Sequence, residues 1–97
     1  MSPKLIYRPE AEADLKEAYG WYSAQNTGAD FLSKIGQITE RIEENPEQFP
    51  KVFGYVRRAL LKGFPYAVFF TGDELGVVVI AVFRQRRDPR RWQERLG

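Results

Sequence analysis

Residues 55–83 read YVRRALLKGFPYAVFFTGDELGVVVIAVF, and this stretch sets the architecture of the chain. It contains three runs rich in β-branched and aromatic residues, 55–61, 66–71 and 76–83, which predict three consecutive strands. The connections between the runs contain glycine or proline and are short enough to join antiparallel neighbours. The third run has no polar alternation, so we expect it to be buried on both faces and central in the sheet.

The residues before this stretch predict two amphipathic helices that form an antiparallel hairpin. In both segments apolar side chains recur at spacings of four, three and four, which is one face of a helix. The first helix is expected over residues 9–24, and residues 25–28 form a turn by composition. The second helix ends at Asn45, because a residue before proline is pushed out of helical geometry. We expect residues 46–54 to be a loop.

A short apolar segment, residues 4–7, precedes the helices and predicts a first strand, which pairs with an edge or beside the central strand. The order is β-α-α-β-β-β, an α+β fold. Its N-terminal helical hairpin packs on one face of a small, mainly antiparallel sheet and leaves the opposite face open. Residues 84–97 are a basic tail in which Asp88 caps a short helix. The length fits one domain over residues 1–97.

Composition excludes several kinds of chemistry. The chain has no cysteine and no histidine, so it lacks disulfides, thiolate and histidine metal sites, and the commonest general base near neutral pH. We expect neither a metal nor a cofactor. The N-terminus has no apolar signal segment, and the longest apolar run, 77–83, is too short to span a bilayer. A cytoplasmic protein without membrane contact is expected.

The charge is distributed asymmetrically along the chain. Residues 1–50 carry a net charge of −4 and residues 51–97 a net charge of +6. A basic half on a small domain favours an acidic partner, either a nucleic acid or an acidic protein. The alternative is a solvated surface whose two halves attract each other.

Cationic side chains are the strongest candidates for a binding site on the predicted sheet. The cluster consists of Arg57, Arg58, Lys62, Arg84, Arg86 and Arg87. Because side chains alternate along a strand, Arg57 and Arg58 point to opposite faces, and one of them faces away from the helices. Guanidinium forks suit phosphate or carboxylate groups. The alternative is an ion pair between one of these arginines and a helix acid such as Glu40 or Glu43.

Aromatic residues add two further candidates. In the tail, RQRRDPRRWQERLG, basic residues surround Trp92, and such a segment can hold nucleic acid by charge and stacking. The alternative is that Trp92 packs on the sheet and anchors the tail. Tyr19 and Trp21 lie beside the buried face of the first helix, where they can contact a partner.

Four segments together resemble a known family. They are LIYRPEAEADLKEAYGWY at 5–22, NPEQFP at 45–50, VRRALLKGFPYAVFF at 56–70 and VVVIAVFRQRRDPRRW at 77–92. This combination resembles the RelE/ParE toxin superfamily, and most of all its ParE-type, or plasmid stabilization, toxins of type II toxin–antitoxin systems. The most specific pieces are VRRALLKGFPYAVFF and QRRDPRRW.

The resemblance implies the same β-α-α-β-β-β fold and a hetero-oligomer with a cognate antitoxin. It implies contact with operator DNA only indirectly, through that antitoxin. Some members of the superfamily cut messenger RNA on the ribosome, whereas ParE-like members poison DNA gyrase.

The residues of this chain favour the second activity. Cleavage of RNA through its 2′-hydroxyl needs a group that accepts a proton. Arg84 stands where many relatives carry histidine, an arginine stays protonated, and no tyrosine follows Tyr66. Lys62 would need a strongly lowered pKa to act as a base. The residues that a ribonuclease would use are Arg57, Arg58, Lys62 and Arg84.

We therefore expect a toxin that binds and inhibits gyrase without catalytic residues. The expected target-binding residues are Arg84, Arg86, Arg87, Arg90, Arg91 and Trp92. The expected antitoxin-binding residues are Tyr19, Trp21, Arg57, Arg58 and Arg84. Two alternatives stay open, a ribosome-dependent messenger RNA endoribonuclease like RelE and a non-toxic antitoxin-binding module.

Overall fold

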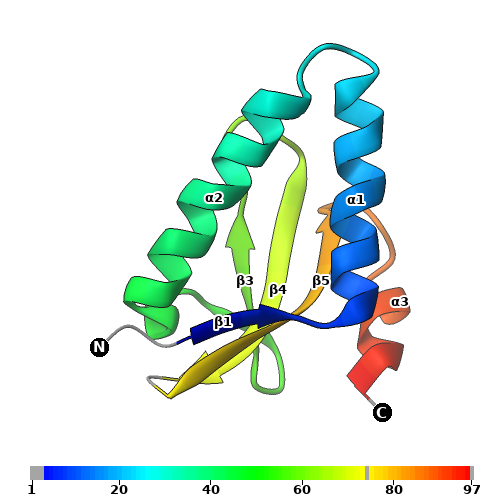
Figure 1. Cartoon of the computed structure of the whole chain (residues 1–97). Coiled ribbons are helices and arrows are strands. Elements are labelled where there is room, and N and C mark those ends of the chain that lie inside the picture. The colour runs from blue at the N-terminus through cyan, green and yellow to red at the C-terminus, as the bar shows by residue number, and fades with distance from the viewer. Residues whose placement is uncertain (1–3, 74, 97) are drawn as a thin grey trace.

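The computed structural model describes residues 4–73 and 75–96, and it shows one sheet with a helical hairpin on one face (Figure 1). The strands are β1 (Lys4–Tyr7), β2 (Lys51–Phe53), β3 (Val56–Leu60), β4 (Tyr66–Asp73) and β5 (Gly76–Arg84). The helices are α1 (Pro9–Ser23), α2 (Gly28–Glu44) and α3 (Arg90–Gln93), with 3₁₀ turns η1 (Pro46–Gln48) and η2 (Glu94–Leu96). In the described part of the chain, no helix is long and apolar enough to cross a membrane.

The strands lie in the order β1-β5-β4-β3-β2, which confirms the predicted α+β fold. β1 pairs with β5 in parallel, and the other neighbours are antiparallel. The first strand is thus an edge strand, reached through the helical hairpin. β5 is buried along most of its length, as predicted, but β4 and not β5 lies at the centre. That part of the prediction was wrong because it did not include β2, which extends the sheet beyond β3.

The predicted loop at residues 46–54 was wrong in part, because it contains η1 and the edge strand β2. Lys51 pairs with Arg57 and Phe53 with Val56 across a tight turn in which Gly54 has a φ of 55°. All residues of β2 are exposed, so the segment shows no alternation that sequence reasoning could detect.

A β-bulge in β5 redirects its side chains. Phe69 pairs with Ala81 and Phe70 with Val79, so Ile80 is an extra residue without a partner on β4. Before the bulge, Val79 faces the helical hairpin; after it, the next side chain packed in that cluster is Val82. Ile80 belongs to the apolar cluster on the other face. The strand is therefore apolar on both faces.

The main core lies between the sheet and the hairpin. Tyr22 of α1 stacks on Phe31 of α2, with 5.0 Å between ring centroids, and Phe31 is fully buried. Below them Phe70 of β4 is also fully buried. The apolar residues that recur at helical spacing in α1 and α2 therefore form the faces that pack in this core.

The opposite face of the sheet is not left entirely open, contrary to the prediction. Trp92 of α3 is 2% exposed and stacks on Phe69 with 4.5 Å between centroids. The other members of this second cluster are Val56, Ala67, Ile80, Ala81 and Phe83. A short helix near the C-terminus thus covers part of the face that the hairpin does not reach.

The β4–β5 turn generates a stability prediction. Glu74 of the predicted turn 72–75 lies outside the described residues. A Cβ at Gly72 would lie 2.5 Å from the Gly76 carbonyl oxygen and 2.8 Å from the Val77 Cα, both backbone atoms that cannot move aside. Gly72→Ala should therefore lower the free energy of unfolding by about 2 kcal/mol. Urea unfolding followed by circular dichroism measures the change.

Gly36→Ala is the matched control, because nothing lies within 4 Å of a Cβ at this position in α2. It should raise the free energy of unfolding by about 0.5–1 kcal/mol, since alanine is the better helix former. Equal effects of the two substitutions would contradict the steric explanation.

Candidate functional site

A depression of about 670 Å³ lies between α1 and the segment that follows β5. Its lining is cationic and aromatic, and we call it the arginine–aromatic depression: Glu17, Trp21, Tyr66, Arg84, Arg86 and Arg87. Glu17 and Trp21 are four residues apart on α1 and so share one helix face. Tyr66 and Arg84 are direct partners in the β4–β5 ladder. Helix periodicity and strand register together assemble this surface.

Two of the three arginines of the depression lie over aromatic rings. The guanidinium carbon of Arg84 lies 5.7 Å from the centroid of Tyr66, and that of Arg87 lies 4.5 Å from the centroid of Phe83. A hydrogen bond with the Tyr66 side chain raises the pKa of Arg84 above its ordinary value. Like any guanidinium, Arg84 stays protonated, so this positive charge of the depression is permanent.

No carboxylate of the described residues lies within ion-pair distance of the three arginines of the depression. Trp21 stands beside them with 57% of its surface exposed. The lining therefore combines three arginines, against the single carboxylate of Glu17, with an accessible indole, which suits an acidic partner that also carries apolar groups.

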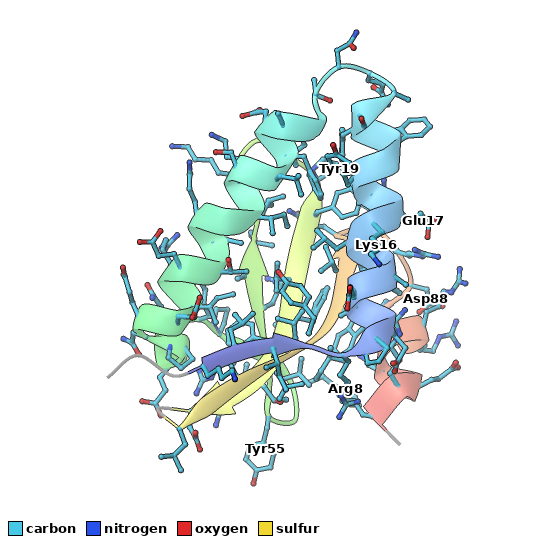
Figure 2. All side chains as sticks on the ribbon, in the orientation of Figure 1. Arg8, Lys16, Glu17, Tyr19, Tyr55 and Asp88 are labelled. Carbon is cyan, nitrogen blue, oxygen red and sulfur yellow. The ribbon has the colours of Figure 1, made fainter. Side chains whose placement is uncertain are left out.

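The C-terminal segment is fixed to the sheet by an ion pair that we call the Asp14–Arg95 clasp. The two groups make two hydrogen bonds, of 2.7 and 3.0 Å, and both side chains are largely buried. Asp14 also accepts a hydrogen bond from the Val82 amide, and Arg95 donates to the Ile80 carbonyl. Arg8 donates to the Arg95 carbonyl; Figure 2 shows its side chain reaching the C-terminal helical segment.

The clasp occupies backbone groups of β5 that β1 leaves unpaired. β1 ends at Tyr7, and the following amide, that of Arg8, donates to the Val79 carbonyl. Beyond this point the side chains of Asp14 and Arg95 take the place of a strand. Because buried backbone groups need partners, the clasp both completes the sheet and holds the tail in place.

The structure brings together only part of the predicted target-binding set. Arg84, Arg86 and Arg87 line one depression, as described above. Arg90 instead forms an ion pair with Asp88 at 2.8 Å on the surface. Hydrogen bonds that the Arg90 side chain and amide donate to Asp88 hold the pKa of Asp88 below its usual value. Arg91 is exposed on α3.

The expected contact of Trp92 with the target disagrees with its burial. The ring is almost inaccessible because it stacks on Phe69, and Phe53 meets it edge-on at 6.0 Å. The alternative, in which Trp92 packs on the sheet and anchors the tail, is the arrangement that the structure shows. Trp92 is therefore a core residue.

Arg57 and Arg58 point to opposite faces, as the alternation predicts. Arg57 donates to the Phe49 carbonyl at 2.6 Å and to the Glu47 carbonyl at 3.3 Å, so it fastens η1 to β3. Arg58 lies on the other face, beside Trp92. Among the described residues neither forms an ion pair, so the alternative of a pair with a helix acid, Glu40 or Glu43, was wrong.

The four residues that a ribonuclease would use do not converge. Each lines a separate depression: Arg84 beside α1, Lys62 beside α2, Arg58 beside α3 and Arg57 beside η1. The residues described in the structure also hold no group of three acidic side chains able to bind a metal ion.

The predicted antitoxin-binding residues are spread over more than one surface. Trp21 and Arg84 share the arginine–aromatic depression. Tyr19 is 39% exposed, and Figure 2 shows it between α1 and α2 near the hairpin turn. Arg57 and Arg58 lie on β3 and line two other depressions.

Sequence reasoning missed Tyr66, Glu17 and the Asp14–Arg95 clasp. Two signals were available: Glu17 is four residues before Trp21 on a predicted helix, and counting across the predicted β4–β5 hairpin places Tyr66 opposite Arg84. For the clasp there was no signal, because 81 positions separate its two residues.

Comparison with solved structures shows what the fold resembles. One similar chain carries the description "Chromosomal ParDE TA system from P. aeruginosa", with a TM-score of 0.72 and 18% sequence identity over 86% of this chain and 96% of that chain. At this identity the likeness concerns the fold alone. No curated protein matches this sequence. The fold is thus one that is found in a toxin–antitoxin system.

The sequence itself gives the family. Residues 5–89 match the family described as "ParE toxin of type II toxin-antitoxin system, parDE". The match spans most of the chain, so this protein belongs to the ParE toxin family. The resemblance inferred from its motifs is confirmed.

The clasp generates a prediction about the tail. Asp14→Asn leaves the largely buried Arg95 without its counter-charge and weakens the acceptor of the Val82 amide. The free energy of unfolding should fall by about 2–3 kcal/mol, because one partner of a sheltered charge pair remains. Thermal and urea unfolding measure the loss.

Asp88→Asn is the matched control, because it breaks an ion pair of similar length on the surface. Solvent-exposed ion pairs contribute little to folding stability, so the unfolding midpoint should hardly change. A clasp variant as stable as this control would show that the ion pair does not hold the tail.

Proposed function

We propose that this ParE-family toxin inhibits DNA gyrase by binding to it, and that a cognate antitoxin neutralises the toxin. The arginine–aromatic depression makes the central contact with the target, with Arg90 and Arg91 nearby in sequence. The observation that carries the proposal is that Arg84, Arg86 and Arg87 gather beside the exposed Trp21, without a carboxylate partner among the described residues.

The chemistry of the site supports binding over cleavage. Arg84 cannot accept a proton, because a guanidinium stays protonated near neutral pH. Burial raises the pKa of the neighbouring Tyr22, so this phenol also stays protonated. The chain has no histidine, and the candidate nuclease residues are dispersed over four depressions. A surface of fixed cations recognises acidic groups without breaking bonds.

Neutralisation follows from overlap between the two binding surfaces. Trp21 and Arg84 belong to one depression, so an antitoxin segment that covers them blocks the target contact. Such a segment is apolar and acidic, to match the lining. The sheet has two edges, β1 and β2, that can accept an added strand. The proposal includes a cytoplasmic hetero-oligomer that reaches operator DNA only through the antitoxin.

The proposal predicts inhibition of purified gyrase. The toxin should block supercoiling and accumulate cleavage complexes, and the variant Arg84→Gln/Arg86→Gln/Arg87→Gln should need about tenfold more protein, since charge complementarity governs the encounter. Plasmid supercoiling gels measure both effects. The control Lys34→Gln/Arg41→Gln/Lys51→Gln removes the same charge elsewhere and should inhibit like the parent protein.

Three results would contradict this proposal. Normal supercoiling with excess toxin would remove gyrase as the target. Codon-aligned cuts in messenger RNA after induction, mapped by primer extension, would favour the ribonuclease alternative. Unimpaired growth on induction of the toxin alone would favour a non-toxic antitoxin-binding module.

The proposal also predicts a hot spot for the antitoxin. Trp21→Ala should weaken binding of the cognate antitoxin about 30-fold, because exposed tryptophans at interface centres carry much of the affinity. Calorimetric titration measures it. Tyr55→Ala is the control: Tyr55 is 82% exposed and lies at the other end of the molecule from Tyr19 (Figure 2). Equal losses would place the antitoxin elsewhere.

A further inference from the structure

We infer that Glu17 determines the class of partner that the arginine–aromatic depression accepts. Its carboxylate adapts this surface to a protein segment that carries acidic groups beside a hydrogen-bond donor, and it disfavours nucleic acid. The inference rests on the proposed function, because it concerns the partner bound at the same site. It gives a role to the one residue of the lining that runs against the positive charge of this surface.

Without Glu17, the lining would suit a strand of nucleic acid as well as it suits a protein. Arg84, Arg86 and Arg87 are cations that can neutralise backbone phosphates, and this attraction does not depend on sequence. The exposed indole of Trp21 offers a surface on which a base can stack. The arginines and the indole alone therefore do not choose between the two classes of partner.

Helix periodicity places Glu17 beside these groups. Glu17 precedes Trp21 by four residues, so the carboxylate and the indole share one face of α1, and both line the depression. The next residue, Ala18, is 2% exposed and packs in the main core, so Glu17 itself is directed outward. Figure 2 shows Glu17 on the side of α1 that points away from α2. A partner that covers Trp21 therefore also meets the carboxylate of Glu17.

The carboxylate of Glu17 is not neutralised by the described part of the chain, in which Glu17 forms no ion pair. Glu12 on the same helix provides the contrast, because it pairs with Lys16 at 3.5 Å. Two arginines of the depression lie over aromatic rings, 4.5 and 5.7 Å from the ring centroids, and are positioned by these rings. Glu17 thus remains available as an acceptor for a group of the partner.

The chemistry of the two classes of partner differs at this carboxylate. A nucleic acid backbone repeats one negative charge per nucleotide, so a phosphate that approaches the arginines is repelled by Glu17. A protein segment can place carboxylates on the arginines and an N–H, ammonium or guanidinium group on Glu17, and hydrogen bonds to a charged acceptor are strong. Glu17 therefore attracts one class and repels the other, and specificity is the difference between the two affinities.

The variant Glu17→Gln tests the inference, because it removes the charge and keeps the size of the side chain. Binding to immobilised gyrase without DNA should weaken about fivefold, since a charge-assisted hydrogen bond is lost. Binding to short fluorescent DNA, single-stranded and duplex, should strengthen about threefold at low ionic strength, since a like charge is removed. Fluorescence anisotropy measures the second effect. A purely long-range effect of charge would instead strengthen binding to DNA and to an acidic protein surface alike.

Two controls locate the effect in the depression. Glu40→Gln removes the same charge from an exposed position of α2 and should change neither affinity. The gain in DNA affinity from Glu17→Gln should vanish when Arg84, Arg86 and Arg87 are also replaced by glutamine, because the DNA then lacks the cations beside Glu17.

The outcomes separate this inference from the proposed function. A parent chain that does not bind gyrase would contradict the proposed function, and the DNA measurements would still test Glu17. If the parent chain binds gyrase, equal or tighter binding of gyrase by Glu17→Gln would overturn the inference alone. Unchanged DNA affinity in Glu17→Gln would also overturn it. Tight DNA binding by the parent chain that Glu17→Gln weakens would assign the depression to nucleic acid, with Glu17 as a contact to a base.

Discussion

The backbone of β5 imposes the constraint on which the rest of the structure depends. This strand is buried, so its amides and carbonyls need partners along both edges. β4 supplies one edge completely, but β1 ends at Tyr7 and leaves the other edge half covered. The clasp of Asp14 and Arg95 completes it, and the Ile80 bulge adds an unpaired residue whose carbonyl Arg95 reaches.

The position of the tail follows from this constraint. With Arg95 bound to Asp14, the short α3 lies against the sheet and Trp92 covers Phe69. The segment between β5 and α3 is then held at both ends, which restricts the positions that its arginines can adopt. Arg87 lines both the arginine–aromatic depression and a smaller depression beside Arg58 and Trp92, so this segment connects two cationic surfaces. A structural requirement of the backbone thereby shapes the arginine–aromatic depression.

The distribution of cations explains why the proposed contacts are with acidic groups. The basic half of the chain forms most of the sheet and the tail, whereas the acidic half forms the helices. Few of these charges neutralise one another: the ion pairs of the described residues are two within helices, one at the start of α3 and the clasp. Arg57, Arg58 and Arg84, which a ribonuclease would use, line different depressions. Separation favours recognition over concerted chemistry, since catalysis needs its groups within hydrogen-bond reach of one substrate.

Local patterns in the sequence determined much of the fold, whereas contacts between distant parts of the chain were decided by the tertiary structure. Apolar spacing and Pro46 placed both ends of α1 and the end of α2 within one residue, because a helix repeats its environment every few residues. The lack of histidine in the composition likewise restricted the chemistry open to this protein. By contrast, β2 is too short and exposed to show a pattern, and the clasp joins residues 81 positions apart. The burial of Trp92 and the unsatisfied Arg58 exist only once α3 has docked on the sheet. Periodicity shows which side of an element is apolar, but the packing of the whole domain determines what that side contacts. For this reason the arginine–aromatic depression and the clasp exist only in the folded chain.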